Sequence, residues 1–489
     1  MRITTMGILI ASLAVGSAPA AAAEGDAVLL AEGSGKKEEP AKGAAPGRDG
    51  PAKPEPVKPA PEKPATEKPA TEKPVPAKAP SPAAPPVVDP APGMAASQID
   101  YFQNGVDGEI FIPIRNLYIP AGKGRQFGNW MGRMFFTEKA TWDDNIYATE
   151  KDKEDDFIFL STLGASFVRQ GSDFSSEVTL SGTFEAYLDE SENNFLDLYG
   201  RAGFQYGFRK GFVRFTDVFS RSEDSVQSVT NGVGSGPLVF TGADKVFQVS
   251  NEARVVGGYE FTKARIEGSY TNVLRNYGKG LEDLDGMEHV FALSPSYRMS
   301  PKAEVGVEVE YRMQGYDERV NNDYDSWAAY ATAKYLPTPK VEVYGRLGYL
   351  SQDIDEGSGT VIDDEEFSGF AGRAGLLWKA TAKVKADLFL SQDIHPVQGA
   401  NYQYATLLGA SLAWEIDPIW KADFRVTWQD SDPSVGEDQG YYTGSGRLGY
   451  RMSEWTELAF QYELRARSSS TLHSDFVNHR VSLQLSLLF

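Results

Sequence analysis

The residue types that most often carry chemistry are scarce in this chain of 489 residues. It has no cysteine, which excludes disulfides, thiolate metal sites and a cysteine nucleophile. Its four histidines are His289, His395, His473 and His479, and no G-x-S-x-G motif accompanies them. The acidic residues are too scattered to single out a pair of catalytic carboxylates. We therefore expect no enzymatic activity, no catalytic residue, no metal site and no cofactor.

Acidic side chains outnumber basic ones, 68 to 48, which gives a net charge of -20. This balance argues against nucleic acid as a partner, because phosphate binding needs a basic face. Two acidic runs, residues 152–156 and 363–366, offer oxygen ligands, but neither follows the calcium loop with its central Gly and terminal Glu. We expect solvated loops there, or loose divalent bridges to lipopolysaccharide phosphates.

The charged residues beyond about residue 132 alternate with apolar ones, and this period of two indicates β-strands. In residues 304–313 the odd positions are apolar and the even ones are charged, polar or Gly, and residues 420–429 repeat the pattern with the parities exchanged. These runs cover about 10 to 15 residues, whereas strands of soluble sheets average five or six. Such lengths predict strands that cross a membrane.

Short and long connections take turns between the alternating runs. Short ones fall near residues 170–173, 210–211, 260–262, 300–301, 337–339, 380–382, 417–418 and 453–454, and nine longer polar ones lie between them, residues 391–401 being one. Seventeen connections imply about 18 strands, with a range of 16 to 18. The even number suits an all-β, antiparallel, up-and-down transmembrane barrel with both ends in the periplasm.

The alternation assigns one set of charged side chains to the inside of this barrel. The set mixes both signs, which favours a water-filled lumen cross-linked by ion pairs; selection of a polyanionic solute is the alternative. The candidates for the pore lining are Arg201, Arg265, Arg312, Arg346, Arg373, Arg425, Arg447, Arg465, Arg480, Glu185, Glu267, Glu308, Glu342, Asp423 and Glu463. By the same register His289 and His479 face outward, and His395 and His473 fall in long connections.

Aromatic residues and the end of the chain support a membrane barrel. The rings that stand beside short connections resemble the girdle at one membrane interface: Phe208, Tyr259, Tyr297, Tyr335, Trp378, Trp414, Trp420, Tyr450 and Trp455. Residues 481–489 alternate up to a terminal Phe, which looks like the signal that presents outer-membrane barrels to the assembly machinery.

The first 130 residues have a different composition. Residues 1–23 combine Arg2, a short apolar run and an A-x-A site, as in a signal peptide. Residues 24–98 hold 17 of the 28 prolines and predict a disordered Pro/Ala/Lys-rich linker in the periplasm. Residues 99–130 form a periplasmic lead-in, a plug or an extra hairpin, and the barrel occupies residues 131–489.

A family resemblance adds to these predictions. Residues 140–147, ATWDDNIY, followed by the DDFI run at 155–158 and FEAY at 184–187, resemble the opening of the putative β-barrel porin type 2 family. The resemblance implies an outer-membrane barrel, and several members are associated with exopolysaccharide or capsule production. It supplies no catalytic residue, and the proline-rich linker is not part of its pattern.

Three functions remain open after these observations. The first is a channel that passes or helps export a hydrophilic solute, with polysaccharide as the leading class. The others are a general diffusion porin for uptake and a structural anchor tied to the cell wall by the linker. The expected partners are outer-membrane lipid and lipopolysaccharide, the barrel assembly machinery, and either peptidoglycan or a periplasmic polysaccharide-export component.

Overall fold

The computed structural model describes residues 110–112, 117–120, 124–224, 226–228, 238–240, 246–278, 281–317, 321–355, 359, 366–397, 400–434, 438–469 and 475–489. The chain divides into two units, Met1–Pro86 and Val87–Phe489, and all described residues belong to the second unit. The expected signal peptide and proline-rich linker lie outside the described residues.

The second unit consists almost entirely of β-strands. The short strands are β1 (Ile110–Ile112), β2 (Leu117–Ile119), β3 (Arg125–Phe127), β9 (Val226–Ser228) and β10 (Leu238–Phe240). The long strands of the first half are β4 (Trp130–Asp143), β5 (Asp156–Gln170), β6 (Phe174–Tyr187), β7 (Phe195–Phe208), β8 (Gly211–Asp224), β11 (Val246–Glu260), β12 (Ala264–Tyr277), β13 (Gly286–Ser300) and β14 (Ala303–Tyr316). Those of the second half are β15 (Tyr324–Thr338), β16 (Val341–Ile354), β17 (Phe367–Thr381), β18 (Val384–Val397), β19 (Ala400–Glu415), β20 (Trp420–Pro433), β21 (Gln439–Ser453), β22 (Thr456–Ser469) and β23 (Phe476–Leu488). Two 3-10 turns, η2 (Ser191–Asn193) and η3 (Glu282–Leu284), complete the elements.

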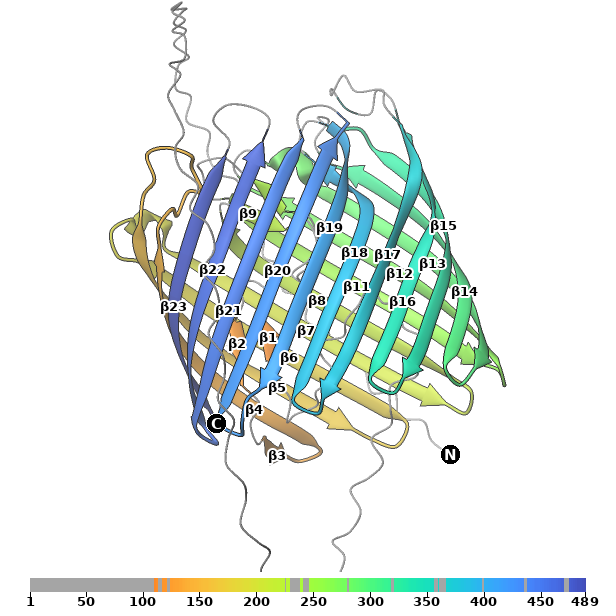
Figure 1. Ribbon diagram of the computed structural model, residues 1–489, viewed down its shortest axis with the longest axis horizontal. Coiled ribbons are helices and arrows are strands. Elements are labelled where there is room, and N and C mark those ends of the chain that lie inside the picture. Colours follow the sequence, from red (N-terminus) through yellow and green to blue (C-terminus); the bar gives the residue numbers. More distant parts are fainter. Residues whose placement is uncertain are drawn as a thin grey trace, which may run out of the picture. The chain divides into compact units, whose positions relative to one another are not determined.

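The long strands form one closed barrel (Figure 1). Each pairs antiparallel with the next along the chain, and β23 pairs with β4 to close the ring. The ring therefore has 18 long strands, which confirms the predicted fold class and strand number. The short β3 adds to β4 alone, while β1–β2 and β9–β10 are separate two-stranded sheets. Closure leaves the sheet without a long free edge, which is what a membrane requires of strands.

The short connections at one end share a local device. In several of them a Ser, Thr or Asp side chain accepts a hydrogen bond from a backbone N–H two residues later, which stabilises a tight turn. The donor and acceptor residues are Lys302 to Ser300, Lys340 to Thr338, Lys383 to Thr381, Ile419 to Asp417 and Trp455 to Ser453. These turns explain why neighbouring strands are joined so closely at this end.

The outer face of the barrel is largely apolar, because successive side chains of a strand point to opposite faces. Leu347 and Phe370 are 65% and 67% exposed on this face. The aromatic residues predicted for a girdle lie beside the short turns, with Trp420 and Tyr450 in ring contact at 4.7 Å. Within the described ranges no helix has the length and hydropathy of a membrane span.

One predicted connection is wrong. Residues 391–401 were expected to form a long loop, but β18 continues to Val397 and β19 begins at Ala400, so His395 lies in a strand. The charged and polar residues in this stretch broke the alternation that signals a membrane strand. The reason is that this part of the hairpin does not face lipid: it packs inside the barrel, as the contacts of Ile394 below show.

Candidate functional site

The fifteen candidate residues share the side of the barrel wall that is opposite the exposed hydrophobics. Arg346 pairs with Arg373 across β16 and β17, whereas their neighbour Leu347 lies on the outer face. The pairing registers place the other candidates on the same inner side. That a solute passes along them stays a prediction.

A buried chain of ion pairs runs along the inner face of β12, β13 and β14. Arg275 Nη2 donates to Glu288 Oε2 (2.8 Å), and Arg312 Nε lies 3.1 Å from Glu288 Oε1. Arg312 Nη2 also donates to Glu310 Oε1 (2.9 Å). Two arginines thus share one buried carboxylate, which compensates the cost of removing these charges from water.

Arg346 continues this charged wall on β16. Its Nη1 donates to Glu308 Oε1 (2.6 Å), and its Nη2 lies 3.8 Å from Asp393 Oδ2 on β18. The guanidinium also stacks over the ring of Tyr330, 4.5 Å from its centroid. Arg346 therefore links β16 to side chains on β14, β15 and β18.

A second group of charges lies on β20, β21 and β22. Arg447 contacts Asp423 on one side (3.4 Å) and Glu457 on the other. Arg465 Nε donates to Glu463 Oε1 (2.6 Å). The inner wall is thus cross-linked by ion pairs on both sides of the barrel, which is the arrangement that mixed charges predict for a rigid lumen.

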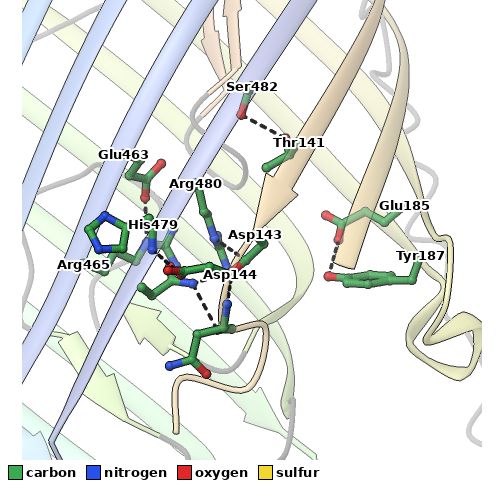
Figure 2. A network of polar contacts seen from close by, with 12 residues as sticks. Thr141, Asp143, Asp144, Glu185, Tyr187, Glu463, Arg465, His479, Arg480 and Ser482 are labelled. Carbon is green, nitrogen blue, oxygen red and sulfur yellow. Dashed lines mark hydrogen bonds and ion pairs between the residues drawn. The ribbon is translucent and has the colours of Figure 1, made fainter. Parts of the chain in front are cut away.

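The closing seam between β23 and β4 carries its own polar network (Figure 2). Arg480 Nε donates to Asp143 Oδ2 (2.6 Å), and Asn478 Nδ2 donates to the other oxygen of the same carboxylate. Further along the seam the hydroxyls of Thr141 and Ser482 are 2.9 Å apart. These contacts join two strands that are far apart in the sequence.

The remaining candidates also have identifiable neighbours on the inner face. Their contacts are Arg201 with Glu177 (2.9 Å), Arg265 with Glu267, Lys334 with Glu342 (2.7 Å), Glu185 with the Tyr187 hydroxyl (3.3 Å), and Arg373 over the Phe389 ring (4.5 Å). Arg425 lies between Ser411 and Ser445 of the adjacent strands.

A cavity of about 530 Å³ opens on the inner face between β5 and β17. Six arginine or lysine and seven glutamate side chains line it, so its charges nearly balance. Arg254 is one of the lining cations, and its Nε has no hydrogen-bond partner among the described residues. Among the described residues, no three His, Asp or Glu side chains are grouped so that they could hold a metal ion.

The β1–β2 hairpin lies inside the barrel. Leu117 and Ile119 are fully buried in a cluster with Phe135, Tyr199 and Leu488, which point inward from β4, β7 and β23. Arg133 donates a hydrogen bond to the carbonyl of Pro120 (3.4 Å), the residue that directly follows β2. Part of the lumen is therefore filled by residues that precede the barrel strands.

Sequence reasoning missed the position of the β18–β19 hairpin end. This end is opposite the short turns, a position called the outer end of a strand from here on, and it also lies inside the barrel. Ile394 is 2% exposed and packs against Tyr330, Leu350 and Ala371 on the inner faces of β15, β16 and β17. The sequence signal was the polar stretch of residues 391–393 together with His395, which looks the same in a surface loop. Only the tertiary contacts distinguish the two.

Comparison with protein families gives one match: the family described as Putative beta-barrel porin 2 matches residues 259–489. The match covers β12 to β23 and lies outside residues 140–187, on which the resemblance in the sequence rested. It confirms the predicted family. No curated protein matches the chain.

Three solved structures match the chain at low identity and with TM-scores below 0.5. Pseudomonas aeruginosa OccK1 (OpdK) is 10% identical, with a TM-score of 0.41 over 73% of this chain and 99% of that one. Acinetobacter baumannii OccAB4 is 12% identical, with a TM-score of 0.39 over 73% of this chain and 98% of that one. The FrpB iron transporter of Neisseria meningitidis is 8% identical, with a TM-score of 0.37 over 74% and 82%. Likeness at this level assigns neither a solute nor a direction of transport.

The closed barrel, its apolar outer face and its charged inner face agree with the family match. This chain is therefore a porin-like β-barrel of the outer membrane, whose residues 259–489 match the Putative beta-barrel porin 2 family.

Proposed function

We propose that this barrel is a channel for a hydrophilic solute and that the solute is a polysaccharide. The observation that carries the proposal is the inner wall, where ion pairs cross-link a polar surface around a cavity while the outer wall is apolar. A barrel of 18 strands is wide enough for an aqueous channel. The absence of enzymatic activity stays a prediction, supported by the matched family being one of porins.

Two features favour polysaccharide as the solute. The family resemblance includes barrels associated with exopolysaccharide, and the cavity lining has nearly balanced charges, which suits a neutral or weakly charged polymer. A deletion strain is expected to lose surface glycan and to recover it with the intact gene. Normal surface glycan in the deletion strain would contradict export.

Uptake of a small hydrophilic solute is the second candidate. The β1–β2 hairpin and the outer ends of β18 and β19 both lie inside the barrel, and they leave less room for a polymer than an empty lumen would. Uptake predicts normal surface glycan and slow growth of the deletion strain on a limiting solute. The two phenotypes therefore separate the candidates.

Arg254 provides a test of the cavity as the path. It lines the cavity, so Arg254→Glu should make the channel more cation-selective. Arg312→Glu is the contrasting variant. Arg312 is held by Glu288 and Glu310, so replacing its positive charge with a negative one should impair folding. An unchanged reversal potential in folded Arg254→Glu protein would mean that ions do not pass this cavity.

We further propose that residues 24–98 extend into the periplasm and reach peptidoglycan or a component of polysaccharide export. Extended proline-rich chains span about 3.1 Å per residue, which supports a long reach. In this proposal the barrel contacts lipopolysaccharide outside and reaches the membrane through the assembly machinery. An anchoring role predicts membrane blebbing that removal of residues 24–98 alone reproduces.

A further inference from the structure

The ladder between β17 and β18 covers only part of its possible length. Pairing runs from Gly372 with Gln392 to Thr381 with Val384, at the end with the short turn. Beyond Gly372, β17 continues to Phe367 and β18 continues to Val397, but no pairing joins these outer ends among the described residues. This seam therefore lacks backbone pairing over the last five residues of β17, Phe367 to Ala371, a longer unpaired stretch than the three residues at the start of β7.

The outer end of β18 turns inward instead of pairing with β17. Ile394 packs against Tyr330, Leu350 and Ala371, which all face the lumen. Arg346 of the inner wall contacts Asp393, one residue before Ile394. The β18 end therefore lies over the inner faces of β15, β16 and β17.

β19 follows β18 inward and covers the gap. The ring of Phe367, on the inner side of β17, lies 5.2 Å from the ring of Tyr402 and 5.1 Å from that of Tyr404. The Tyr404 hydroxyl donates to the carbonyl of Phe370 (2.9 Å). Two side chains of β19 that would face lipid in a regular barrel, Tyr402 and Tyr404, are thus packed against Phe367 on the inner side of β17.

Polar contacts hold the start of β19 in this position. Asn322, in the connection between β14 and β15, donates from Nδ2 to Asn401 Oδ1 (3.0 Å). Gln352 of β16 donates to the backbone carbonyl of Asn401 (3.4 Å). These contacts reach across three strands, so the hairpin end covers one side of the lumen.

The same residues also fit a second arrangement. If the existing register of β17 and β18 continued outward, Ala371 would pair with Asp393, Phe370 with Ile394, and Gly369 with His395. Side chains alternate along a strand, so Ile394 would face lipid beside Phe370, and Asp393 and His395 would face the lumen. Pro396 has no amide hydrogen and would end the added ladder.

We propose that the outer ends of β18 and β19 form a gate, which narrows the lumen when packed inward and widens it when β18 pairs with β17 along the continued register. Inward packing exchanges ladder hydrogen bonds for the Ile394 cluster and the contacts of Asn401, and outward pairing reverses the exchange. The gating role rests on the proposed channel function. The exchange of strand pairing does not.

A cysteine pair tests the exchange, and the natural chain offers a clean background because it has no cysteine. Phe370→Cys with Ile394→Cys should form a disulfide only when the outer ladder pairs. Leu376→Cys with Leu388→Cys is the matched control, because these residues pair in the existing ladder, face the same side and differ in position by six residues. Both pairs are made in the full chain in outer-membrane vesicles and read by gel mobility.

The expected result is complete oxidation of the control pair and slower, cumulative oxidation of the Phe370 and Ile394 pair. The disulfide should shift single-channel conductance upward in a planar bilayer, and reductant should restore the starting value. A third variant, Asn322→Cys with Asn401→Cys, bridged by a short bifunctional thiol reagent, should keep conductance at the low level.

Three results of the cysteine experiment would contradict different parts of the proposal. If the Phe370 and Ile394 pair stays reduced while the control pair oxidises fully, the hairpin end does not exchange and the proposal is wrong. If it oxidises and a conducting channel does not change, the hairpin moves but does not gate, and the proposal is also wrong. If it oxidises in a protein that never conducts, strand exchange stands and the channel function fails.

Discussion

Two seams of the barrel differ in how their outer ends are held. At the seam of β23 with β4, pairing reaches Arg480 and Asp143, at the outer end of β4. At the seam of β17 with β18, pairing stops at Gly372 and Gln392. The first seam is cross-linked by side chains up to its end, whereas the second leaves its outer strand ends apart.

The difference follows from chain connectivity and from the side chains available. β23 and β4 are not joined by a turn, so side-chain contacts such as that of Arg480 with Asp143 must help to hold their ladder. β17 and β18 are joined by a tight turn at one end, and near the opposite end the inner side of β17 carries Phe367, Gly369 and Ala371, none of which has a polar side chain. Apolar side chains cannot form a cross-strand polar contact, so backbone pairing alone could join β17 to β18 beyond Gly372.

The largest expected effect is at the closing seam. Asp143 is fully buried and accepts hydrogen bonds from Arg480 and Asn478, so Asp143→Ala removes a buried carboxylate that contacts a mostly buried guanidinium. Breaking a buried pair in this way costs about 3–5 kcal/mol. We expect a fall of this size in the free energy of unfolding, measured by urea titration in lipid vesicles. Asp143→Asn should lower the free energy of unfolding by less. If the urea midpoint of Asp143→Ala equalled that of the natural protein, side-chain contacts would not distinguish the two seams.

A smaller effect is expected at the other seam. Phe367→Ala removes the ring contacts with Tyr402 and Tyr404, and such aromatic pairs contribute about 0.5–1.5 kcal/mol each. The loss falls on the inward-packed state alone, so the variant should show more of the high-conductance state. Phe389→Ala, which removes an inner-face ring from the paired part of β18, is the control. If Phe367→Ala and the natural protein spent equal fractions of time in the high-conductance state, these contacts would not hold the hairpin inward.

The smallest effect is expected for Tyr404→Phe. It removes one hydroxyl that donates to the carbonyl of Phe370 and leaves the ring in place. A single hydrogen bond contributes about 0.5–1.5 kcal/mol, and less when it is exposed. We expect a small shift of channel statistics in the direction of Phe367→Ala and no change in unfolding. A shift larger than that of Phe367→Ala would mean that the hydroxyl, not the ring contacts, holds the hairpin inward.

Strand number and inner-face residues follow from the sequence because the alternation in a membrane barrel is strict. Residues 304–313 alternate without a break, and the structure places their charged members on the inner face. The two departures have physical causes. Asp393 and His395 read as loop residues because the β18 end faces the inner wall, and Leu117 and Ile119 belong to a hairpin too short for periodicity to identify.

The partners of individual charges could not be predicted in the same way. Arg254 and Arg312 are equivalent in the alternating pattern, but Arg254 lines the cavity and Arg312 is held between Glu288 and Glu310. Pairing depends on the stagger of neighbouring strands, which the residue order along a single strand does not contain.

The most direct test of the central claim is the conductance of the refolded protein in a planar bilayer, comparing the chain from residue 24 with a variant that also lacks residues 24–120. A water-filled lumen partly occupied by the β1–β2 hairpin predicts discrete conductance steps that are larger in the truncated form. If neither form conducts, although both migrate as folded barrels in unheated gel samples and shift after heating, the barrel is not a channel.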